Sequence, residues 1–511
     1  MASRRTTLAL VGLALIAALV SFAAPRAEAQ LFGAGPEFRA LWVDAFHDGV
    51  KTADQVDRLL ADARRANLNA VIVQVRRRGD SYYSRSLEPR TEDASLAPGF
   101  DSLDYLIDRA HNGLPRLEVH AWIATYAVWN ERDRPPRDPS HVFNQHGPNA
   151  PGRDNWLLRR DDGETWANGY FLDPGHPEVA RYTADVALNL VREYDLDGLH
   201  LDYVRYPEGS ADHSWGYNET SVARFNARYG RDGVPDRRDP QWSQWRRDQV
   251  TALVRRICLG ALAAKPQLKV SAAVIPWGAG PASDADWSKT AAYSAVFQDW
   301  RAWLEEGILD LAIPMDYYRE SVPPQGAWFD RWVAWQREHA YGRQMAPGIA
   351  LYLNTPAESI NQLRRALASA AGGTRVSGVA LYSYGATRRP SGDGDPPEVA
   401  DLDVWAALAS PVPANDWAPP FPAPVSVPAM GWKTTPQNGS ILLRAPGLDG
   451  ARVEVGGPAV SGGETDGNGV YGLAVAPPGH YALTVRHPSL AEPRSAQLDV
   501  MPGAVSEIEL R

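Results

Sequence analysis

The sequence predicts an α/β protein, a (β/α)8 TIM-type barrel followed by a small all-β sandwich domain. Strand-like and helix-like segments alternate over residues 37–410, which is typical of βα units around a parallel sheet. A proline-rich linker follows at residues 411–430. Residues 431–511 contain short alternating strands between Gly, Pro and Asp turns, the pattern of a β-sandwich accessory domain.

The first 29 residues have the pattern of a secretory signal peptide. Two arginines precede an apolar run over residues 8–22, and Ala-Glu-Ala at residues 27–29 offers an A-x-A cleavage site. The run is short for a transmembrane helix, and no later segment approaches the ~18 apolar residues that a membrane span needs. We therefore expect an exported protein, periplasmic or extracellular, without integral membrane association.

The barrel region contains eight strand-like segments, separated by amphipathic stretches with helix start signals. The strand-like segments span residues 38–46, 69–76, 117–126, 198–206, 269–277, 309–317, 344–353 and 376–384. The clearest helical stretches span residues 52–67, 177–194, 241–264, 293–306, 356–371 and 399–409. Eight such units over about 370 residues fit a closed barrel with enlarged loops better than an open sheet.

Composition excludes several classes of partner. The net charge of -9 at pH 7 argues against nucleic acid or an anionic membrane surface, since both attract basic proteins. Cys258 is the only cysteine, so an intramolecular disulfide is impossible. The His and Cys spacings typical of metal sites are missing from the sequence, and we expect neither a metal nor a cofactor.

Polar and aromatic residues occur where the barrel strands end. Because the C-terminal ends of barrel strands form the catalytic face, we expect these side chains to surround one site. Carboxylates can transfer protons and flat rings stack on sugars, so the pattern favours a polysaccharide or oligosaccharide substrate. The candidate substrate-binding residues are Asp44, Gln74, Arg76, Trp122, Arg205, Trp277, Tyr317, Tyr352 and Tyr384.

Asp202 and Asp316 are the candidate catalytic residues. Each follows an apolar strand, and period-two alternation is expected to point both carboxylates over the barrel axis. Asp202 would then act as nucleophile or base and Asp316 as acid. The alternative for Asp202 is a structural ion pair with Arg205 or Arg76. Asp44 has two equal interpretations, binding of substrate hydroxyls and a structural role at the rim.

Several segments resemble the glycosyl hydrolase-like 10 family of exported bacterial (β/α)8 proteins. They are EFRALWVDAF, LNAVIVQVRRRGDSYY and FLDPGHPEVARYTADVALNLVREYDLDGLHLDYVRYP, with looser agreement in IPMDYY and VALYSYG. The resemblance implies glycoside hydrolysis, with envelope glycans such as peptidoglycan strands lacking stem peptides as one substrate. Asp202 matches the family's motif acid, and Asp316 is carried over more loosely. Many relatives have a second acid directly after the motif acid, whereas in this chain Tyr203 follows Asp202.

The C-terminal segment ETDGNGVYGLAVAPPGHYALTV resembles carboxypeptidase regulatory-like, transthyretin-type sandwich modules, which are usually accessory. The sequence as a whole therefore predicts an exported glycoside hydrolase with a two-carboxylate acid/base mechanism. A non-catalytic glycan-binding barrel is the alternative, because the same aromatic residues would bind sugars without cleaving them. A metal-dependent polysaccharide deacetylase is a third hypothesis, which the absence of metal-binding His spacing disfavours.

Overall fold

The structure is a computed structural model, and it describes residues 35–370, 372–389, 402–411 and 418–510. The predicted signal peptide lies outside the described residues, as do parts of the predicted helix 399–409 and of the linker. Within the described ranges, no helix combines the length and the apolar character needed to cross a membrane.

The barrel region contains nine parallel strand segments in one sheet. They are β1 (Phe38–Val43), β2 (Ala70–Arg76), β3 (Glu118–Ala124), β6 (Gly198–Asp202), β7 (Lys269–Val274), β8 (Leu311–Pro314), β9 (Gln344–Met345), β10 (Gly348–Ala350) and β11 (Gly378–Tyr382). Their order is β10-β11-β1-β2-β3-β6-β7-β8-β9. β9 and β10 belong to one segment, interrupted at Pro347, which has no amide hydrogen to donate. Since β9 pairs with β8 and β10 with β11, the ring closes, and the predicted fold class is confirmed.

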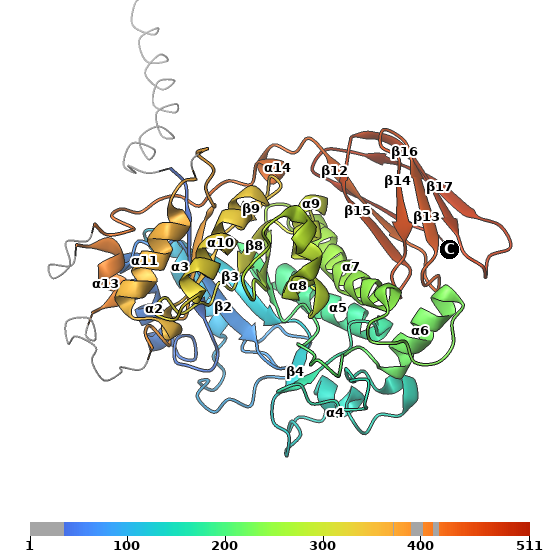
Figure 1. The fold of residues 1–511 in the computed structure, drawn as a ribbon, viewed down its shortest axis with the longest axis horizontal. Coiled ribbons are helices and arrows are strands. Elements are labelled where there is room, and N and C mark those ends of the chain that lie inside the picture. Colours follow the sequence, from blue (N-terminus) through green and yellow to red (C-terminus); the bar gives the residue numbers. More distant parts are fainter. Residues whose placement is uncertain (1–34, 371, 390–401, 412–417, 511) are drawn as a thin grey trace, which may run out of the picture.

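Helices connect the strands and cover the outside of the sheet (Figure 1). The longer ones are α2 (Ala53–Arg65), α3 (Ser102–Asn112), α5 (Pro177–Glu193), α6 (Glu219–Tyr229), α7 (Pro240–Ala264), α9 (Trp300–Glu306), α10 (Gln325–Glu338), α11 (Pro356–Leu367) and α13 (Val404–Ala409). α2 shows why they form: the Thr52 hydroxyl accepts a hydrogen bond from the Gln55 amide, and Val56 and Leu59 are buried on one face. α3, α6 and α10 add to the helices expected from the sequence.

Strand alternation divides the barrel core into two layers. In β1, Leu41 and Val43 join the large core cluster between the sheet and the helices, whereas Ala40 and Trp42 belong to the cluster inside the barrel. The other strands alternate in the same way. The last inward-facing residue of each strand therefore lies at the C-terminal mouth of the barrel.

The largest insertion connects β3 to α5. It contains β4 (Ala127–Trp129) paired with β5 (Tyr170–Phe171), together with α4 (Val142–His146) and the short 3-10 helix η1 (Gly152–Asp154). The amide of Thr125 donates a 2.7 Å hydrogen bond to the carbonyl of Asp202, which fixes the start of the insertion to the end of β6. Four further short elements are η2 (Asp284–Lys289), α8 (Ala291–Ser294), η3 (Leu351–Leu353) and α14 (Gly431–Thr434).

The C-terminal region is a sandwich of two sheets with strand orders β15-β12-β18 and β14-β13-β16-β17. Its strands are β12 (Gly439–Arg444), β13 (Arg452–Gly456), β14 (Ser461–Glu464), β15 (Val470–Ala476), β16 (Gly479–Arg486), β17 (Arg494–Val500) and β18 (Val505–Glu509). Ile441, Leu443 and Val453 are in the core between the sheets. The sequence suggests five of these strands, over residues 440–444, 451–455, 470–475, 480–486 and 496–500. β14 and β18 add to them, and β14 has the sequence SGGE, which carries little strand propensity.

The sandwich packs on the outside of the barrel beside α7 (Figure 1). Leu259 of α7 forms a small apolar cluster with Leu442 and Val470. Arg224 of α6 forms an ion pair of 2.6 Å with Asp449, and both guanidinium contacts are hydrogen bonds. This contact is therefore apolar at its centre and charged beside it.

The described part of the proline-rich segment lies against the barrel. Phe421 is fully buried, and the amide of Glu37 donates a 3.0 Å hydrogen bond to the carbonyl of Ser426. Arg39 of β1 donates to the carbonyl of Ala423 at 2.8 Å and lies over the Phe421 ring. Residues 418–430 thus have extensive contacts with the barrel rather than bridging freely to the sandwich.

Candidate active site

A cleft of about 750 Å³ opens at the C-terminal ends of the barrel strands. Its floor includes Trp42 of β1, Trp122 of β3, Asp202 of β6 and Tyr382 of β11. Eleven of its 25 lining residues are aromatic, so the cleft offers flat apolar surfaces beside a few polar groups. A larger groove of about 1560 Å³ lies between α6, α7 and the sandwich, away from the strand ends where barrel enzymes place their chemistry.

Asp202 is the buried carboxylate of this cleft. Its side chain accepts two hydrogen bonds, from the indole Nε1 of Trp122 at 3.1 Å and from the backbone amide of Tyr203 at 2.7 Å. Burial raises the pKa of Asp202 above its usual value, although the Arg205 charge and both hydrogen bonds favour the ionised form. Asp202 is therefore held in a fixed orientation and keeps its proton to a higher pH than an ordinary aspartate.

Tyr203 has a backbone conformation that is rare for an aromatic residue. Its φ is 50°, in the left-handed region, immediately after β6 ends. The turn directs the Tyr203 amide to Asp202, and the residue is 37% exposed in the cleft, with its ring tilted against Phe171. Such strain usually persists where the local geometry matters for function.

His200 lies below Asp202, inside the barrel. The indole Nε1 of Trp42 donates to His200 Nε2 at 3.1 Å, and His200 Nδ1 contacts the Ser271 hydroxyl at 2.9 Å. Burial lowers the pKa of His200 well below its usual value, so the ring is neutral. Because Nε2 accepts a hydrogen bond, the proton is on Nδ1, and His200 supports the cleft floor rather than contacting a ligand.

Two carboxylates line the cleft among the described residues, Asp202 and Glu208. Glu208 is exposed, and its backbone carbonyl accepts a hydrogen bond of 3.2 Å from the Trp215 indole. Sequence reasoning missed Glu208. The signal was its position directly after the strand-end segment that contains Asp202.

Asp316 does not line the cleft, which differs from the expectation that it faces Asp202. It is fully buried, and both of its oxygens accept hydrogen bonds of 3.0 Å from Nε2 of Gln336 on α10. Alternation correctly groups Asp316 with Ala312, but Ala312 belongs to the outer core, whereas Ile313 faces the barrel interior. The expectation for Asp316 was therefore wrong about the face of the strand, because the side of β8 that carries Ala312 points to the helices.

Arg76 and Asp44 also lie outside the cleft, contrary to their expected contact with substrate. Arg76 is fully buried in an ion pair of 2.7 Å with Glu88, because the pairing of β2 with β3 is irregular between Gln74 and Arg76. Asp44 accepts hydrogen bonds from the amides of residues 46 and 47 and from the Ser383 hydroxyl, so it holds the rim together.

Tyr384 is the third expected substrate-binding residue that the structure places elsewhere. Its hydroxyl donates a 2.9 Å hydrogen bond to Asp62 of α2, and its ring stacks on Trp405. β11 ends at Tyr382, whose ring lines the cleft instead and lies 5.4 Å from the Tyr317 ring. The inward position on β11 thus belongs to Tyr382.

The remaining expected residues do line the cleft: Gln74, Trp122, Arg205, Trp277, Tyr317 and Tyr352. Gln74 accepts a hydrogen bond of 3.0 Å from the amide of Ala45, which positions its side chain. Sequence reasoning missed the aromatic residues Trp42 and Trp215, which also line the cleft. Trp42 was detectable because it occupies the inward row of β1.

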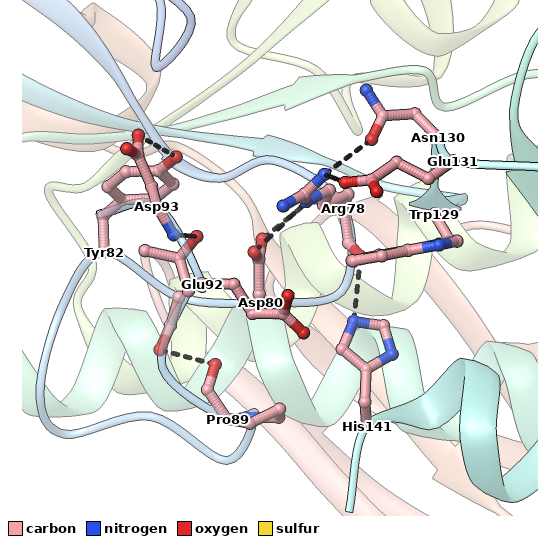
Figure 2. Close-up of polar contacts among 12 residues, drawn as sticks. Arg78, Asp80, Tyr82, Pro89, Glu92, Asp93, Trp129, Asn130, Glu131 and His141 are labelled. Atoms are coloured by element: carbon pink, nitrogen blue, oxygen red, sulfur yellow. Dashed lines mark hydrogen bonds and ion pairs between the residues drawn. The ribbon is translucent and has the colours of Figure 1, made fainter. Parts of the chain in front are cut away.

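One wall of the cleft is cross-linked by polar contacts. Figure 2 shows Arg78 extending between Asp80 and the pair Asn130 and Glu131, with its guanidinium 2.8 Å from the Asn130 oxygen and 3.0 Å from a Glu131 oxygen. The same guanidinium lies over the Trp129 ring. Arg78 is therefore a fully paired cation that ties the segment after β2 to the insertion.

Comparison with known proteins identifies a family that matches most of the chain. The model of the glycosyl hydrolase-like 10 family matches residues 37–365. The chain is 28% identical over 346 residues to "Glycosyl hydrolase YngK" of Bacillus subtilis, covering 64% of this chain and 61% of the relative. It is 25% identical over 280 residues to "Glycosyl hydrolase DigH" of Escherichia coli K12, covering 52% and 57%. The matches thus span less than two thirds of each relative.

Among solved structures, the glycoside hydrolase domain of PgaB (BpsB) from Bordetella bronchiseptica is 16% identical and has a TM-score of 0.45, covering 68% of this chain and 94% of that domain. The family match runs from β1 into α11 and includes the cleft-lining residues except Tyr382 of β11. This chain belongs to the glycosyl hydrolase-like 10 family.

Proposed function

We propose that the protein is an exported enzyme that hydrolyses glycosidic bonds of a polysaccharide, with Asp202 as its proton donor. The observation that supports this most is the position of Asp202, a buried carboxyl at the end of a barrel strand, surrounded by aromatic rings. Sugar rings stack on such surfaces, and glycosidases transfer protons with carboxyl groups. Membership of a glycosyl hydrolase-like family supports the same reaction class.

The proposed step uses the two carboxyl groups of the cleft. Asp202 gives its proton to the glycosidic oxygen as the bond from that oxygen to the anomeric carbon breaks. Glu208 removes a proton from a water molecule, whose oxygen forms the new bond to the anomeric carbon. The raised pKa of Asp202 suits the donor role, and the exposed carboxylate of Glu208 suits contact with water. Asp316, which the sequence suggested as the acid, has no place in this step.

We propose an envelope glycan as the substrate, such as peptidoglycan strands that lack stem peptides. This rests on the predicted signal peptide and on the family resemblance. An open cleft with aromatic residues on several walls suits a chain of sugars better than a single small molecule.

The test compares the wild type with Asp202→Asn and Glu208→Gln on candidate polysaccharides, with release of reducing ends as the readout. We expect Asp202→Asn to lower kcat about 100-fold to 10,000-fold, the usual contribution of a general acid. Glu208→Gln should lower it strongly too, and NMR of the first product should show inverted configuration. A folded Asp202→Asn variant with full activity would refute the assignment.

A glycan-binding barrel without catalysis is the second candidate. Tyr203 favours it, because the family resemblance implies a second acid at this position, which this chain lacks. Such a protein would bind the same polysaccharides through its aromatic cleft but release no reducing ends, and Asp202→Asn would leave its affinity nearly unchanged.

A further inference from the structure

We propose that the cleft contains a subsite for a negatively charged substituent of the substrate, and that Arg205 binds it. This inference rests on the proposed function and narrows it: the substrate is an acidic glycan whose sugars carry carboxylate groups. The observation that supports it is the Arg205 guanidinium, which is buried, lines the cleft and has no carboxylate partner among the described residues.

Arg205 is 9% exposed and lines the cleft. Its Nε has no hydrogen-bond partner, and its one hydrogen bond runs from Nη1 to the carbonyl of Tyr206 at 3.4 Å. Within the described ranges, no carboxylate lies within 4.0 Å of its guanidinium, although the charges of Asp202 and Glu208 reach it through space. Nε is shielded from the cleft, so the terminal Nη2, which donates no hydrogen bond to the described residues, is the group available to a ligand.

An unpaired buried cation is costly, so proteins normally pair it. Two other arginines near this mouth follow that rule. Arg76 is paired with Glu88. Figure 2 shows Arg78 paired with Glu131. Arg77 also lines the cleft without an ion pair among the described residues, but it is only half-buried and lies over the Phe46 ring. Arg205 is the buried one, and the side of it that lines the cleft faces the space where substrate would bind. A carboxylate of the ligand would supply the missing partner.

Two aromatic rings fix the orientation of this guanidinium. Its central carbon lies 5.0 Å from the Tyr203 ring centre and 5.4 Å from the Trp277 ring centre. A planar guanidinium that is already held between rings loses little further conformational entropy when it forms two parallel hydrogen bonds to a carboxylate. The same aromatic rings offer faces on which the sugar can stack, so one subsite can recognise both the sugar ring and its negative charge.

The subsite also fits the proposed reaction. A ligand carboxylate bound to Arg205 adds a negative charge near Asp202 and neutralises the cation that favours the ionised form of Asp202. Both effects raise the pKa of Asp202, which keeps the proton donor protonated while an acidic substrate is bound. A neutral glycan would leave this coupling unused.

The experiment measures binding with catalysis switched off, in the Asp202→Asn background, by titration calorimetry. The probes are polygalacturonate, hyaluronan and peptidoglycan strands without stem peptides. Each is compared with its own carboxyl-reduced form, in which primary alcohols replace the carboxylates. We expect at least one acidic glycan to bind about 10-fold or more tightly than its reduced form, the effect of one hydrogen-bonded charge pair.

Variants then test whether Arg205 is the residue that recognises the carboxylate. Arg205→Met should bring the two forms of the preferred glycan to within about twofold in Kd, and Arg205→Lys should keep part of the difference. Arg160→Met is the matched control: Arg160 lies over the ring of Trp215 in the cleft wall but is paired with Asp162 and does not line the cleft. It should leave the difference unchanged.

The outcomes separate this inference from the proposed function. Cleavage of glycans by the wild type without any preference for the acidic forms overturns the subsite and leaves the hydrolase proposal standing. A preference that persists in Arg205→Met overturns the role of Arg205. Absence of both binding and cleavage with every glycan overturns both proposals. The comparison of native and reduced glycans needs no Arg205 variant, so it decides the matter even if Arg205→Met misfolds.

Discussion

The indole Nε1 of Trp122 donates a 3.1 Å hydrogen bond to Oδ2 of Asp202, joining the inward ends of two neighbouring strands, β3 and β6. Trp122 is therefore both part of the aromatic cleft and a partner of its buried acid. The bond favours the carboxylate, against the effect of burial. The proton affinity of Asp202 thus depends on a side chain that sequence reasoning assigned to substrate binding alone.

Trp122→Phe removes this hydrogen bond and keeps a ring in the cleft. We expect the pKa of Asp202 to rise further, because only the ionised form loses its partner. If Asp202 is the proton donor, the basic limb of the pH–kcat profile should move to higher pH by about one unit. The profile between pH 4 and 9 measures this, and a shift to lower pH would contradict the donor role.

Asp316→Asn should leave hydrolysis nearly unchanged, with kcat/KM within about twofold of the wild type, because Asp316 lies outside the cleft. Burial raises its pKa well above the usual value. Asp316 therefore makes its full contribution to folding stability at pH below the unfolded pKa of about 3.9. This contribution is lost as pH rises through the folded pKa. Asparagine cannot ionise, and its amide can donate to Oε1 of Gln336, which is buried without a partner.

Thermal unfolding of this variant and the wild type from pH 4 to pH 9 measures the effect. The melting temperature of Asp316→Asn, relative to that of the wild type, should increase as pH rises. Loss of hydrolysis in a folded Asp316→Asn protein would instead restore Asp316 as the catalytic partner that the sequence suggested.

The closed barrel and the position of Asp202 at its mouth were predictable from sequence, because alternating segments and a strand ending in an acid are local patterns. Asp316 was not, because alternation shows which residues share a face but not whether that face points to the axis or to the helices. For Arg76, the irregular pairing between β2 and β3 changes the side on which it lies, and this depends on the partner strand.

Long-range contacts explain the remaining differences. Nothing near Arg76 in sequence shows that Glu88, twelve residues later, returns to pair with it. Glu208 lies in the cleft through the path of the loop after β6, which no periodicity describes. Trp42 and Tyr382, in contrast, follow the inward rows of β1 and β11 and were within reach of sequence reasoning once the inward face was known.

Arg76→Met should destabilise the fold by about 3 to 5 kcal/mol, because it leaves Glu88 buried without its partner. Both side chains of this pair are essentially inaccessible to water. The double variant Arg76→Met with Glu88→Gln should recover part of the loss, since no uncompensated charge remains. Urea unfolding measures both.

Arg65→Met is the control for this prediction. Arg65 pairs with Asp62 at 2.9 Å, but its side chain is 47% exposed, so its loss should change stability little. Equal effects of Arg65→Met and Arg76→Met would show that the buried pair contributes no more than a surface one.

Leu259→Ala should weaken the contact between the barrel and the sandwich. Leu259 is fully buried with Leu442 and Val470, and truncation of such a leucine costs about 2 to 5 kcal/mol. We expect calorimetry to show two unfolding transitions in place of one, as the sandwich separates from α7. Arg224→Met should have a smaller effect, because the Asp449 carboxylate that it pairs with is 42% exposed. A larger effect of Arg224→Met would mean that the charged contact, not the apolar one, holds the sandwich in place.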